Sequence, residues 1–281
     1  MKATAPIYLL ITALLLAARI ATAESTTLRE VAAQADSVDE AVQIVSDRLG
    51  QQGFEIPLVV NHAAAAASVE LELRPTQVIF ARPPKFLEQS LLRRGATIGI
   101  DLPLKYLVFE DENGDVQLRS NPVGYLIDRH DLRIRDFGLY LTGALASQFA
   151  DSADGLITVL SQRSFDDTVQ ALQDAIGGNP AFRIPLVLDF GESRRRNGPV
   201  LIVFGNPNAG TPLMQGTQEI ALDLPQKFLV SQSKGVVSIT YNDPLFVAKR
   251  ANLEGQDARL TAIANALANF AAAGAATNSA Q

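Results

Sequence analysis

The sequence predicts an α+β protein of two similar domains, each a mainly antiparallel, curved sheet with helices packed on one face. The first observation is a duplication: segments 56–60 and 184–188 match in chemical order, and so do segments 100–108 and 222–230. The second is a series of short strand patterns joined by tight turns, which is typical of antiparallel pairing. We expect the two copies to pair about a pseudo-two-fold axis.

Three segments divide the chain: a signal peptide at residues 1–23, a first repeat at 24–153, and a second repeat at 154–281 with a C-terminal helix and a frayed tail. The signal peptide is indicated by a basic start, an apolar run over residues 7–18 and Ala-Thr-Ala before Glu24. The apolar run is shorter than the roughly 20 residues of a spanning helix. We expect cleavage after Ala23, a periplasmic or secreted protein, and no stable membrane insertion afterwards. Retention as an uncleaved anchor is the alternative.

Composition excludes several classes of protein. The 281 residues are 47% hydrophobic, enough for two ordinary cores, and the absence of cysteine excludes disulfides and thiol chemistry. The net charge of −6 becomes −8 when Lys2 and Arg19 leave with the signal peptide (−6 − 2 = −8). A negative chain lacks the basic face that nucleic acid requires, so no nucleic-acid partner is expected.

The first repeat begins with a predicted strand at residues 26–33. Ser37-Val38-Asp39-Glu40 is a capping box, and behind it runs a helical stripe of Val38, Val42, Val45 and Leu49. Asn113-Gly114 predicts a hairpin turn, because both residues tolerate positive φ. Further elements are expected as strands at 54–60, 77–80, 104–109 and 116–119, a helical turn at 63–67, and helices at 122–130 and 135–149.

The second repeat follows the same order. A strand is expected at 157–162, and Ser164 then opens a helix. A turn at Lys234-Gly235 and a closing amphipathic helix complete the copy. The stripe of the first helix repeats the spacing seen in the first copy, and the closing helix has its own stripe: Phe165, Val169, Leu172 and Ile176 in the former, Leu260, Ile263, Leu267 and Phe270 in the latter.

Several longer motifs carry a family resemblance. They are Ile-Pro-Leu-Val-Val-Asn-His-Ala-Ala at 56–64, Arg-Pro-Thr at 74–76, Phe-Gly-Asn-Pro-x-x-Gly-Thr-Pro-Leu-Met at 204–214, Leu-Asp-Leu-Pro at 222–225 and Asn-Asp-Pro at 242–244. With these motifs the mature chain resembles, over nearly its whole length, two tandem copies of the family called domain of unknown function 302. The resemblance implies a compact α+β fold with a curved antiparallel sheet, and it brings no assigned reaction.

The two copies have lost different halves of this motif set. The first keeps Asn61 and His62 but has Arg82 and prolines in place of the glycine loop, and the second keeps the loop but has Asp189-Phe190 instead of Asn-His. Independent drift of two dispensable motifs is the simpler interpretation. The alternative is a single shared cleft in which His62 approaches the loop at 205–214.

The loop supplies most of the candidate ligand-binding residues. We expect Gly205 and Gly210 to allow positive φ, and Thr211 to cap a helix that begins at Pro212. Such a loop can direct several N–H groups at an anion, and a tight structural turn is the alternative interpretation. Met214 is expected in the core. The candidate set as a whole is Asn61, His62, Arg82, Gly205, Asn206, Gly210, Thr211 and Met214.

Other chemistry finds little support in the motifs. His62 at a strand end could be a general base, a haem or metal ligand, or a hydrogen-bonded structural group. Two histidines without cysteine or His-x-x-x-His spacing predict no metal site, and no cofactor is identified. We expect Asp101 and Asp223 to cap turns, and Lys105 and Lys227 to lie on a solvated strand face.

Two functions remain from different classes. The preferred one is an exported, non-catalytic binding or accessory protein, for a small anionic or amphipathic ligand. The alternative is an enzyme that uses His62 as acid/base beside a glycine-loop anion site. The position of His62 relative to a pocket distinguishes them. The sequence specifies neither protein partners nor an oligomeric state.

Overall fold

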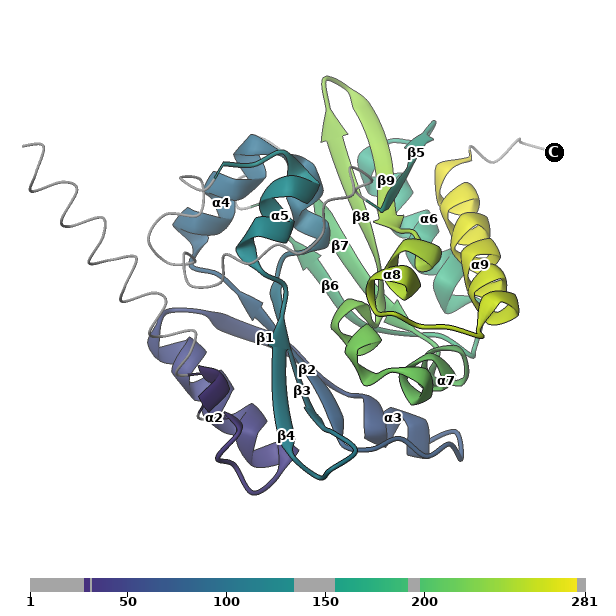
Figure 1. Ribbon diagram of the computed structural model, residues 1–281. Helices are drawn as coiled ribbons and strands as arrows, with labels where there is room; N and C mark the ends of the chain where they lie inside the picture. Colours follow the sequence, from purple (N-terminus) through teal and green to yellow (C-terminus); the bar gives the residue numbers. More distant parts are fainter. Residues whose placement is uncertain (1–27, 31, 134–154, 192–197, 277–281) are drawn as a thin grey trace, which may run out of the picture.

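The computed structural model of the protein describes residues 28–30, 32–133, 155–191 and 198–276 (Figure 1). These residues form two sheets, in the order β1-β2-β3-β4 and β5-β9-β8-β7-β6, and all neighbouring strands are antiparallel. The prediction of two α+β repeats is therefore confirmed. The strands are β1 Glu55–Asn61, β2 Thr76–Arg82, β3 Leu104–Glu110, β4 Val116–Ser120, β5 Leu156–Ser161, β6 Arg183–Asp189, β7 Val200–Gly205, β8 Gln226–Ser233 and β9 Val236–Asn242.

Helices cover one face of each sheet: α2 lies against the first sheet, and α6 and α9 lie against the second (Figure 1). The α-helices are α2 Val38–Gln51, α3 His62–Ala67, α4 Lys85–Arg94, α5 Val123–His130, α6 Phe165–Gly177, α7 Pro207–Gly216, α8 Pro244–Arg250 and α9 Asp257–Ala275. Two 3-10 helices precede β3 and β8, namely η1 Ala96–Ile100 and η4 Gln218–Asp223.

The corresponding helices α2 and α6 begin with the predicted caps. Ser37 Oγ accepts the Glu40 N–H at 3.2 Å, and Ser164 Oγ accepts the Asp167 N–H at 3.2 Å. Glu40 reaches back as a capping box requires, although it accepts the N–H of Asp36 and not that of Ser37. Both predicted stripes face their sheets, α2 against β1, β2 and β3, and α6 against the matching strands β6, β7 and β8. The two helices are therefore equivalent in environment as well as in spacing.

Two hairpins differ in their turn chemistry. Lys234 and Gly235 both have positive φ, 49° and 84°, which suits a two-residue turn between β8 and β9. In the turn between β3 and β4 only Gly114 has positive φ, at 86°. There the Asp111 carboxylate accepts the N–H groups of Asn113 and Asp115 at 2.9 and 3.1 Å, so a side chain completes the turn.

Some expected elements differ or lie outside the described residues. Residues 28–30 and 32 are helical, so the strand predicted at 26–33 is wrong. A helix places Leu28 and Ala32 on one buried face and leaves Glu30 exposed, whereas a strand would turn all three to the same side. The helix predicted at 135–149, the signal peptide and the residues after 276 are not described. Helix α4 was not predicted, and its signal is the i, i+4 spacing of buried Leu87 and Leu91.

The repeats exchange equivalent elements across their interface. Helix η1 of the first repeat packs on β7 and β8, and η4 of the second packs on β2 and β3. Alternate residues of β7 enter different cores: Leu201 and Val203 join the core shared with the first repeat, and Ile202 and Phe204 pack beneath α6 and α9. This reciprocal packing is the arrangement expected of a pseudo-two-fold pair.

Charged side chains are buried at the centre of this interface. We call Asp101, Lys105, Arg129, His130, Asp223, Lys227 and Arg250 the interface charge cluster; each is at most 6% exposed except Arg250, which is half-buried. Lys105 Nζ lies 3.1 Å from carboxylate oxygens of both Asp101 and Asp223. The prediction of solvated lysines and turn-capping aspartates is wrong, because η1 of the first repeat covers strands of the second, and η4 of the second repeat covers strands of the first.

The arginines of this cluster also cross the interface reciprocally. Arg129 NH1 contacts Asp101 at 3.0 Å, and its NH2 donates to Asn242 of the second repeat at 2.7 Å. Arg250 NH1 contacts Asp223 at 2.5 Å, and its NH2 donates to Asn121 of the first repeat. Each arginine therefore joins the aspartate of its own repeat to an asparagine of the other.

Burial and charge oppose one another in the pKa values of this cluster. Burial alone would raise the pKa of Asp101, but Arg129 and Lys105 hold it well below its usual range. Burial lowers the pKa of Lys227 well below that of a free lysine, and the positive charge of Lys105 lowers it further. Lys227 Nζ donates to the Asp223 carbonyl at 3.1 Å and has no ion pair within the described part of the chain. The folded protein therefore favours the neutral amine of Lys227.

Candidate functional site

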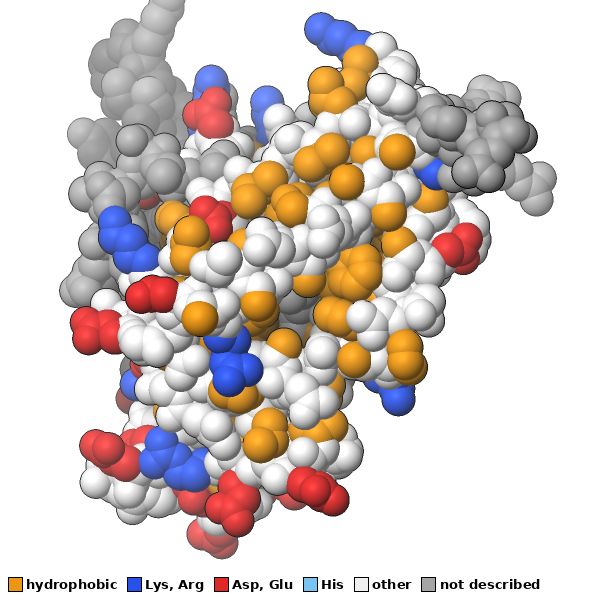
Figure 2. Space-filling view, turned by 90° about the vertical axis from the view of Figure 1, so that its right-hand side faces the viewer, with side chains coloured by type: hydrophobic (Ala, Val, Ile, Leu, Met, Phe, Trp, Pro, Cys, Tyr) orange, Lys and Arg blue, Asp and Glu red, His pale blue; other side chains and the backbone are white. Residues whose placement is uncertain are grey.

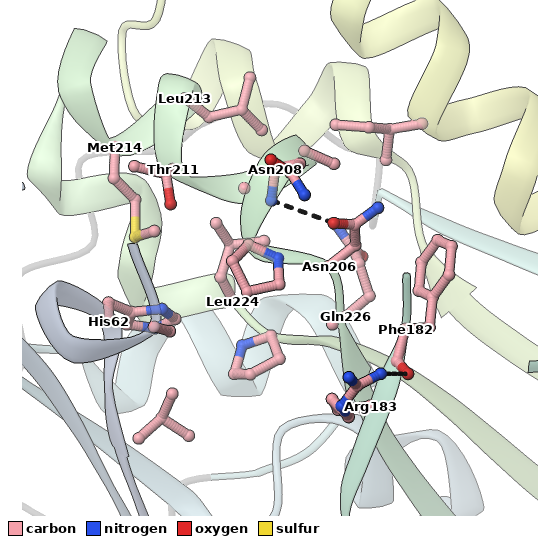
Figure 3. Close-up of a pocket in the computed structure, with 18 of the residues that line it drawn as sticks. His62, Phe182, Arg183, Asn206, Asn208, Thr211, Leu213, Met214, Leu224 and Gln226 are labelled. Atoms are coloured by element: carbon pink, nitrogen blue, oxygen red, sulfur yellow. Dashed lines mark hydrogen bonds between the residues drawn. The ribbon is translucent and has the colours of Figure 1, made fainter. Parts of the chain in front are cut away.

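A pocket of about 570 Å³ lies between the repeats (Figure 3). The first repeat contributes the end of β1 and helix α3, and the second contributes α7, α9, the start of β6 and the segment that enters β8. Figure 2 shows the side of the molecule that carries α9, where hydrophobic side chains gather over the middle and acidic ones lie toward the edges. The pocket is therefore built by the pairing of the two repeats.

The cap of α3 turns His62 into this pocket. Asn61 ends β1, and its side-chain oxygen accepts the Ala64 N–H at 2.8 Å, so Asn61 is an N-cap and does not line the pocket. His62 is the first helical residue, and its side chain is 5% exposed. The alanines that follow it allow α3 to approach α7. The predicted helical turn is confirmed, and its function is to place an imidazole at the interface.

The imidazole of His62 is neutral and has one nitrogen without a partner. Burial lowers its pKa to about 4, although a hydrogen bond to the backbone of Leu224 opposes this shift. Among the described residues Nε2 has no hydrogen-bond partner, so the bond to Leu224 is assigned to Nδ1–H. Nε2 is then a hydrogen-bond acceptor within the pocket.

The segment 205–214 folds differently from the prediction. Gly205 ends β7, Asn206 caps α7 by accepting the Asn208 N–H at 3.0 Å, and Pro207 is the first helical residue. Neither Gly205 nor Gly210 has positive φ, and Thr211 lies inside the helix, so both predictions were wrong. Asn206-Pro207 provides an N-cap and a first-turn proline, which start the helix before Thr211 is reached.

The start of α7 does not offer its N–H groups to an anion. The N–H groups of Ala209 and Gly210 donate to the Asn206 carbonyl at 3.0 Å each, and that of Asn208 donates to the Asn206 side chain. Gly210 instead provides space, because a Cβ at this position would stand 3.8 Å from Leu224 Cδ1, beside the pocket. Gly210 therefore leaves space beside Leu224 and Met214 at the wall of the pocket.

Thr211 and Met214 line the same end of the pocket as His62 (Figure 3). Thr211 is fully buried, and its Oγ1 has no partner among the residues that the structure describes. Met214 is 3% exposed, as expected of a core residue, and its side chain also contacts the pocket space. Two buried polar atoms, one from each repeat, thus share one end of an otherwise apolar pocket.

Arg183, with Phe182 beside it, lies at the opposite end of the view in Figure 3. Arg183 NH1 donates to the carbonyls of Pro180 and Phe182 at 2.5 and 3.0 Å. Arg259 on α9 is the second cation of the lining, and its NH1 donates at 3.4 Å to the Asn208 carbonyl, which Pro212 leaves without its helical partner. Neither arginine pairs with a described carboxylate, and the lining contains no Asp or Glu.

Phe182, Arg183 and Arg259 line the pocket but were not among the predicted site residues. Phe182 and Arg183 lie at the start of β6 and Arg259 lies in the first turn of α9, and the packing of β6, α7 and α9 brings them to one pocket. Of the eight candidates, the lining includes His62, Gly205, Asn206, Gly210, Thr211 and Met214, and it excludes Asn61 and Arg82. His62 and the 205–214 segment therefore do lie at one pocket.

Arg82 occupies the counterpart position in the first repeat. It pairs with Glu55 in the β1–β2 register, as Gly205 pairs with Arg183 in the β6–β7 register. Its guanidinium makes two 2.7 Å bonds with buried Glu88 and lies 6.0 Å from the ring centre of Phe190. Phe190 follows Asp189 as His62 follows Asn61, so an ion pair and an aromatic ring stand where the other half has the pocket.

Two general features of the described residues bear on function. They contain no cluster of three or more His, Asp or Glu side chains placed to hold a metal ion. They also contain no helix that combines the length and apolar character needed to cross a membrane.

Comparison with known families agrees with the repeat architecture. The model of the family described as "Domain of unknown function DUF302" matches residues 29–146 and again 157–272. The chain belongs to the DUF302 family. It carries two tandem DUF302 domains: the first match contains the first sheet and α2, and the second contains α6 and all but the ends of the second sheet and of α9.

Other similarities are partial. The chain is 37% identical over 97 residues to proteins called Fluoride-specific ion channel FluC 1 from Brucella suis biovar 1 (strain 1330) and Brucella abortus biovar 1 (strain 9-941). The match covers 34% of this DUF302 chain and 37% and 35% of those proteins, so the chain spans little more than a third of their length. The crystal structure of an uncharacterized conserved protein DUF302 from Bacillus stearothermophilus is 17% identical, with a TM-score of 0.38, covering 43% of this chain and 98% of that one.

Proposed function

We propose that the two DUF302 domains together form a non-catalytic binding module for a small amphipathic molecule. The observation that carries this proposal is that His62 and Thr211 line one pocket, and that His62 Nε2 and Thr211 Oγ1 are buried and have no hydrogen-bond partner among the residues that the structure describes. An unsatisfied buried polar group costs about 1–3 kcal/mol, and native proteins contain few of them. Two such groups from different repeats at one cavity are what a site for an external polar group requires.

The shape and lining of the pocket support an amphipathic ligand. Its volume of about 570 Å³ falls within the roughly 300–1,000 Å³ of small-molecule sites. Most of the lining is apolar, with side chains such as Leu213, Met214 and Leu267, and the charged groups are the exposed Arg183 and Arg259. A molecule with an apolar body and an anionic group matches this distribution.

Acid/base catalysis by His62 has less support. A pKa of about 4 leaves about one imidazole in a thousand protonated at pH 7, too few for an efficient general acid. The lining also has no carboxylate to orient the ring and stabilise its charged form. The neutral acceptor that remains is suited to binding, which favours the module over the enzyme.

The complementary losses in the two repeats follow from this proposal. One site uses the histidine of the first repeat and the glycine-bearing segment of the second. At the other, the Arg82–Glu88 pair against Phe190 replaces ligand contacts with internal ones. We favour this shared site over the independent drift expected from sequence, because drift gives no reason for the retained halves to meet at one pocket.

We also propose that the protein is exported, in line with the Ala-Thr-Ala site before Glu24. N-terminal sequencing of the protein from its native host should begin at Glu24, in a periplasmic or secreted fraction. An intact Met1 in the membrane fraction would show that the segment is an anchor.

Binding can be tested with 8-anilino-1-naphthalenesulfonate, an amphipathic anion whose fluorescence reports burial. The wild-type protein should bind one probe per chain, and Gly210→Val should weaken binding at least tenfold by placing methyl groups beside Leu224 and Met214. Gly177→Val is the matched control: this glycine is also helical, and a Cβ there meets nothing within 4 Å. Equal binding by both variants, or none by the wild type, would contradict the proposal.

A further inference from the structure

We infer, building on the proposed binding function, that the ligand is an amphipathic acid with a hydroxyl group at the end remote from the acid. The hydroxyl group binds His62 and Thr211, the apolar body fills the pocket, and the acid lies at Arg183. The inference rests on the different chemistry of the two ends of the pocket in Figure 3.

The end at His62 matches a hydroxyl group. Because His62 Nδ1–H is directed to Leu224, Nε2 can only accept a hydrogen bond in its neutral form. Thr211 Oγ–H can donate one. A hydroxyl group is the one simple group that can both donate to Nε2 and accept from Thr211, so its chemistry matches the needs of both orphan atoms. A carboxylate has no proton to donate and would place its charge against the Nε2 lone pair.

The end at Arg183 matches an anion. Both bonds of the guanidinium to backbone carbonyls use NH1, so the Nε and NH2 edge makes no hydrogen bond within the described structure. That edge presents two parallel N–H groups, the geometry that binds a carboxylate in bidentate fashion. Because no acidic side chain lines the pocket, a ligand acid there meets no competing charge.

The volume limits the size of the body between these ends. At about 30 Å³ for each water-sized unit of volume, 570 Å³ corresponds to about 19 units (570/30). A ligand of roughly 12 to 19 non-hydrogen atoms fits this space. 12-Hydroxydodecanoate has 15, counted from its formula, so it is a suitable probe, and dodecanoate is the same molecule without the hydroxyl group.

Calorimetric titration of the full mature chain with these two probes tests the inference. The wild type should bind 12-hydroxydodecanoate at least tenfold more tightly than dodecanoate. Thr211→Val, which removes only the hydroxyl group, should reduce this ratio to below threefold while dodecanoate binding is retained. Thr261→Val on the exposed face of α9 is the matched control and should keep the full ratio. Arg183→Gln should weaken both probes about tenfold and leave their ratio unchanged.

Nitrogen NMR of the imidazoles gives an independent measurement. The chain has only two histidines, and His130 is held by Thr97 and Asp101 at 3.1 and 2.9 Å. 12-Hydroxydodecanoate should shift the Nε2 resonance of His62 and leave that of His130 in place, whereas dodecanoate should leave both unchanged.

The outcomes separate this inference from the function on which it rests. Equal affinity of the wild type for the two probes, with no change in Thr211→Val, would contradict the inferred hydroxyl group on the ligand. It would not contradict the proposed binding function. A wild-type protein that binds neither these probes nor the naphthalenesulfonate would overturn both. A carboxylate end bound at His62 would appear as a protonated imidazole with dodecanoate, and would also overturn the inferred orientation.

Discussion

Asp101→Asn is expected to lower the free energy of unfolding by about 3–5 kcal/mol at pH 7. The Asp101 side chain is fully buried. Its carboxylate oxygens lie 3.1 Å from Lys105 Nζ, 3.0 Å from Arg129 NH1 and 2.9 Å from His130 Nε2. An amide in its place leaves the two cations with Asp223 as their remaining carboxylate in the interface charge cluster. Urea denaturation of the wild type and the variant measures the difference.

Glu219→Gln is the control for this variant, because Glu219 also forms an ion pair across the interface. The Arg119–Glu219 pair, at 3.1 Å, is about half exposed, so its loss should cost less than 1 kcal/mol. The difference between wild type and Asp101→Asn should also shrink in acid. Since the folded pKa of Asp101 is lowered, its contribution is present above the unfolded value of about 4 and is lost as the pH falls through the folded value. Equal costs for both variants would contradict the prediction.

Lys227→Met is expected to have the opposite sign and to raise the free energy of unfolding at pH 7 by about 1–4 kcal/mol. Burial holds the pKa of Lys227 well below its usual value, so folding favours the release of a proton that the unfolded chain holds up to about pH 10. The unfolded state binds more protons, so wild-type stability rises with pH below that value, by roughly 1 kcal/mol per unit where the folded amine is already neutral. The variant should lose this rise, which denaturant titrations between pH 7 and 10 would measure.

The equivalent lysine of the first repeat provides a matched control. Lys105→Met introduces the same side chain at a residue that contacts two aspartates, and it should destabilise the protein by about 3–5 kcal/mol. Two methionine variants that shift stability in the same direction would disprove the assignment of Lys105 as charged and Lys227 as neutral.

Features that depend on local sequence were predictable. The stripes of α2 and α6, the serine caps and the turn at Lys234-Gly235 each depend on residues a few positions apart. The start of α7 was misplaced although it is also local, because Asn206-Pro207 and Thr211-Pro212 both resemble a cap followed by proline. Only the first pair follows directly on the end of β7.

Features that depend on docking of the repeats were not predictable. Lys105 lies on β3 among apolar residues, at a position that the sequence pattern assigns to the solvated face. It is buried because η4 of the other repeat packs on β3. A shared cleft between His62 and the 205–214 segment was one of the two interpretations of the sequence, and the two do line one pocket. Arg183 and Arg259 enter the same lining from β6 and α9, and no spacing in the sequence connects them.

The Arg82–Glu88–Phe190 contact has a consequence for stoichiometry. A homodimer of identical single-domain chains would have to carry the same side chains at both of its equivalent sites, and would offer its ligand two places. Covalent fusion frees each copy to change alone, so here one half lines a cavity while the counterpart position carries an ion pair and an aromatic ring. On the proposed function, such a chain should therefore bind one ligand per molecule with a hyperbolic saturation curve, because its two halves present different side chains at the two equivalent positions.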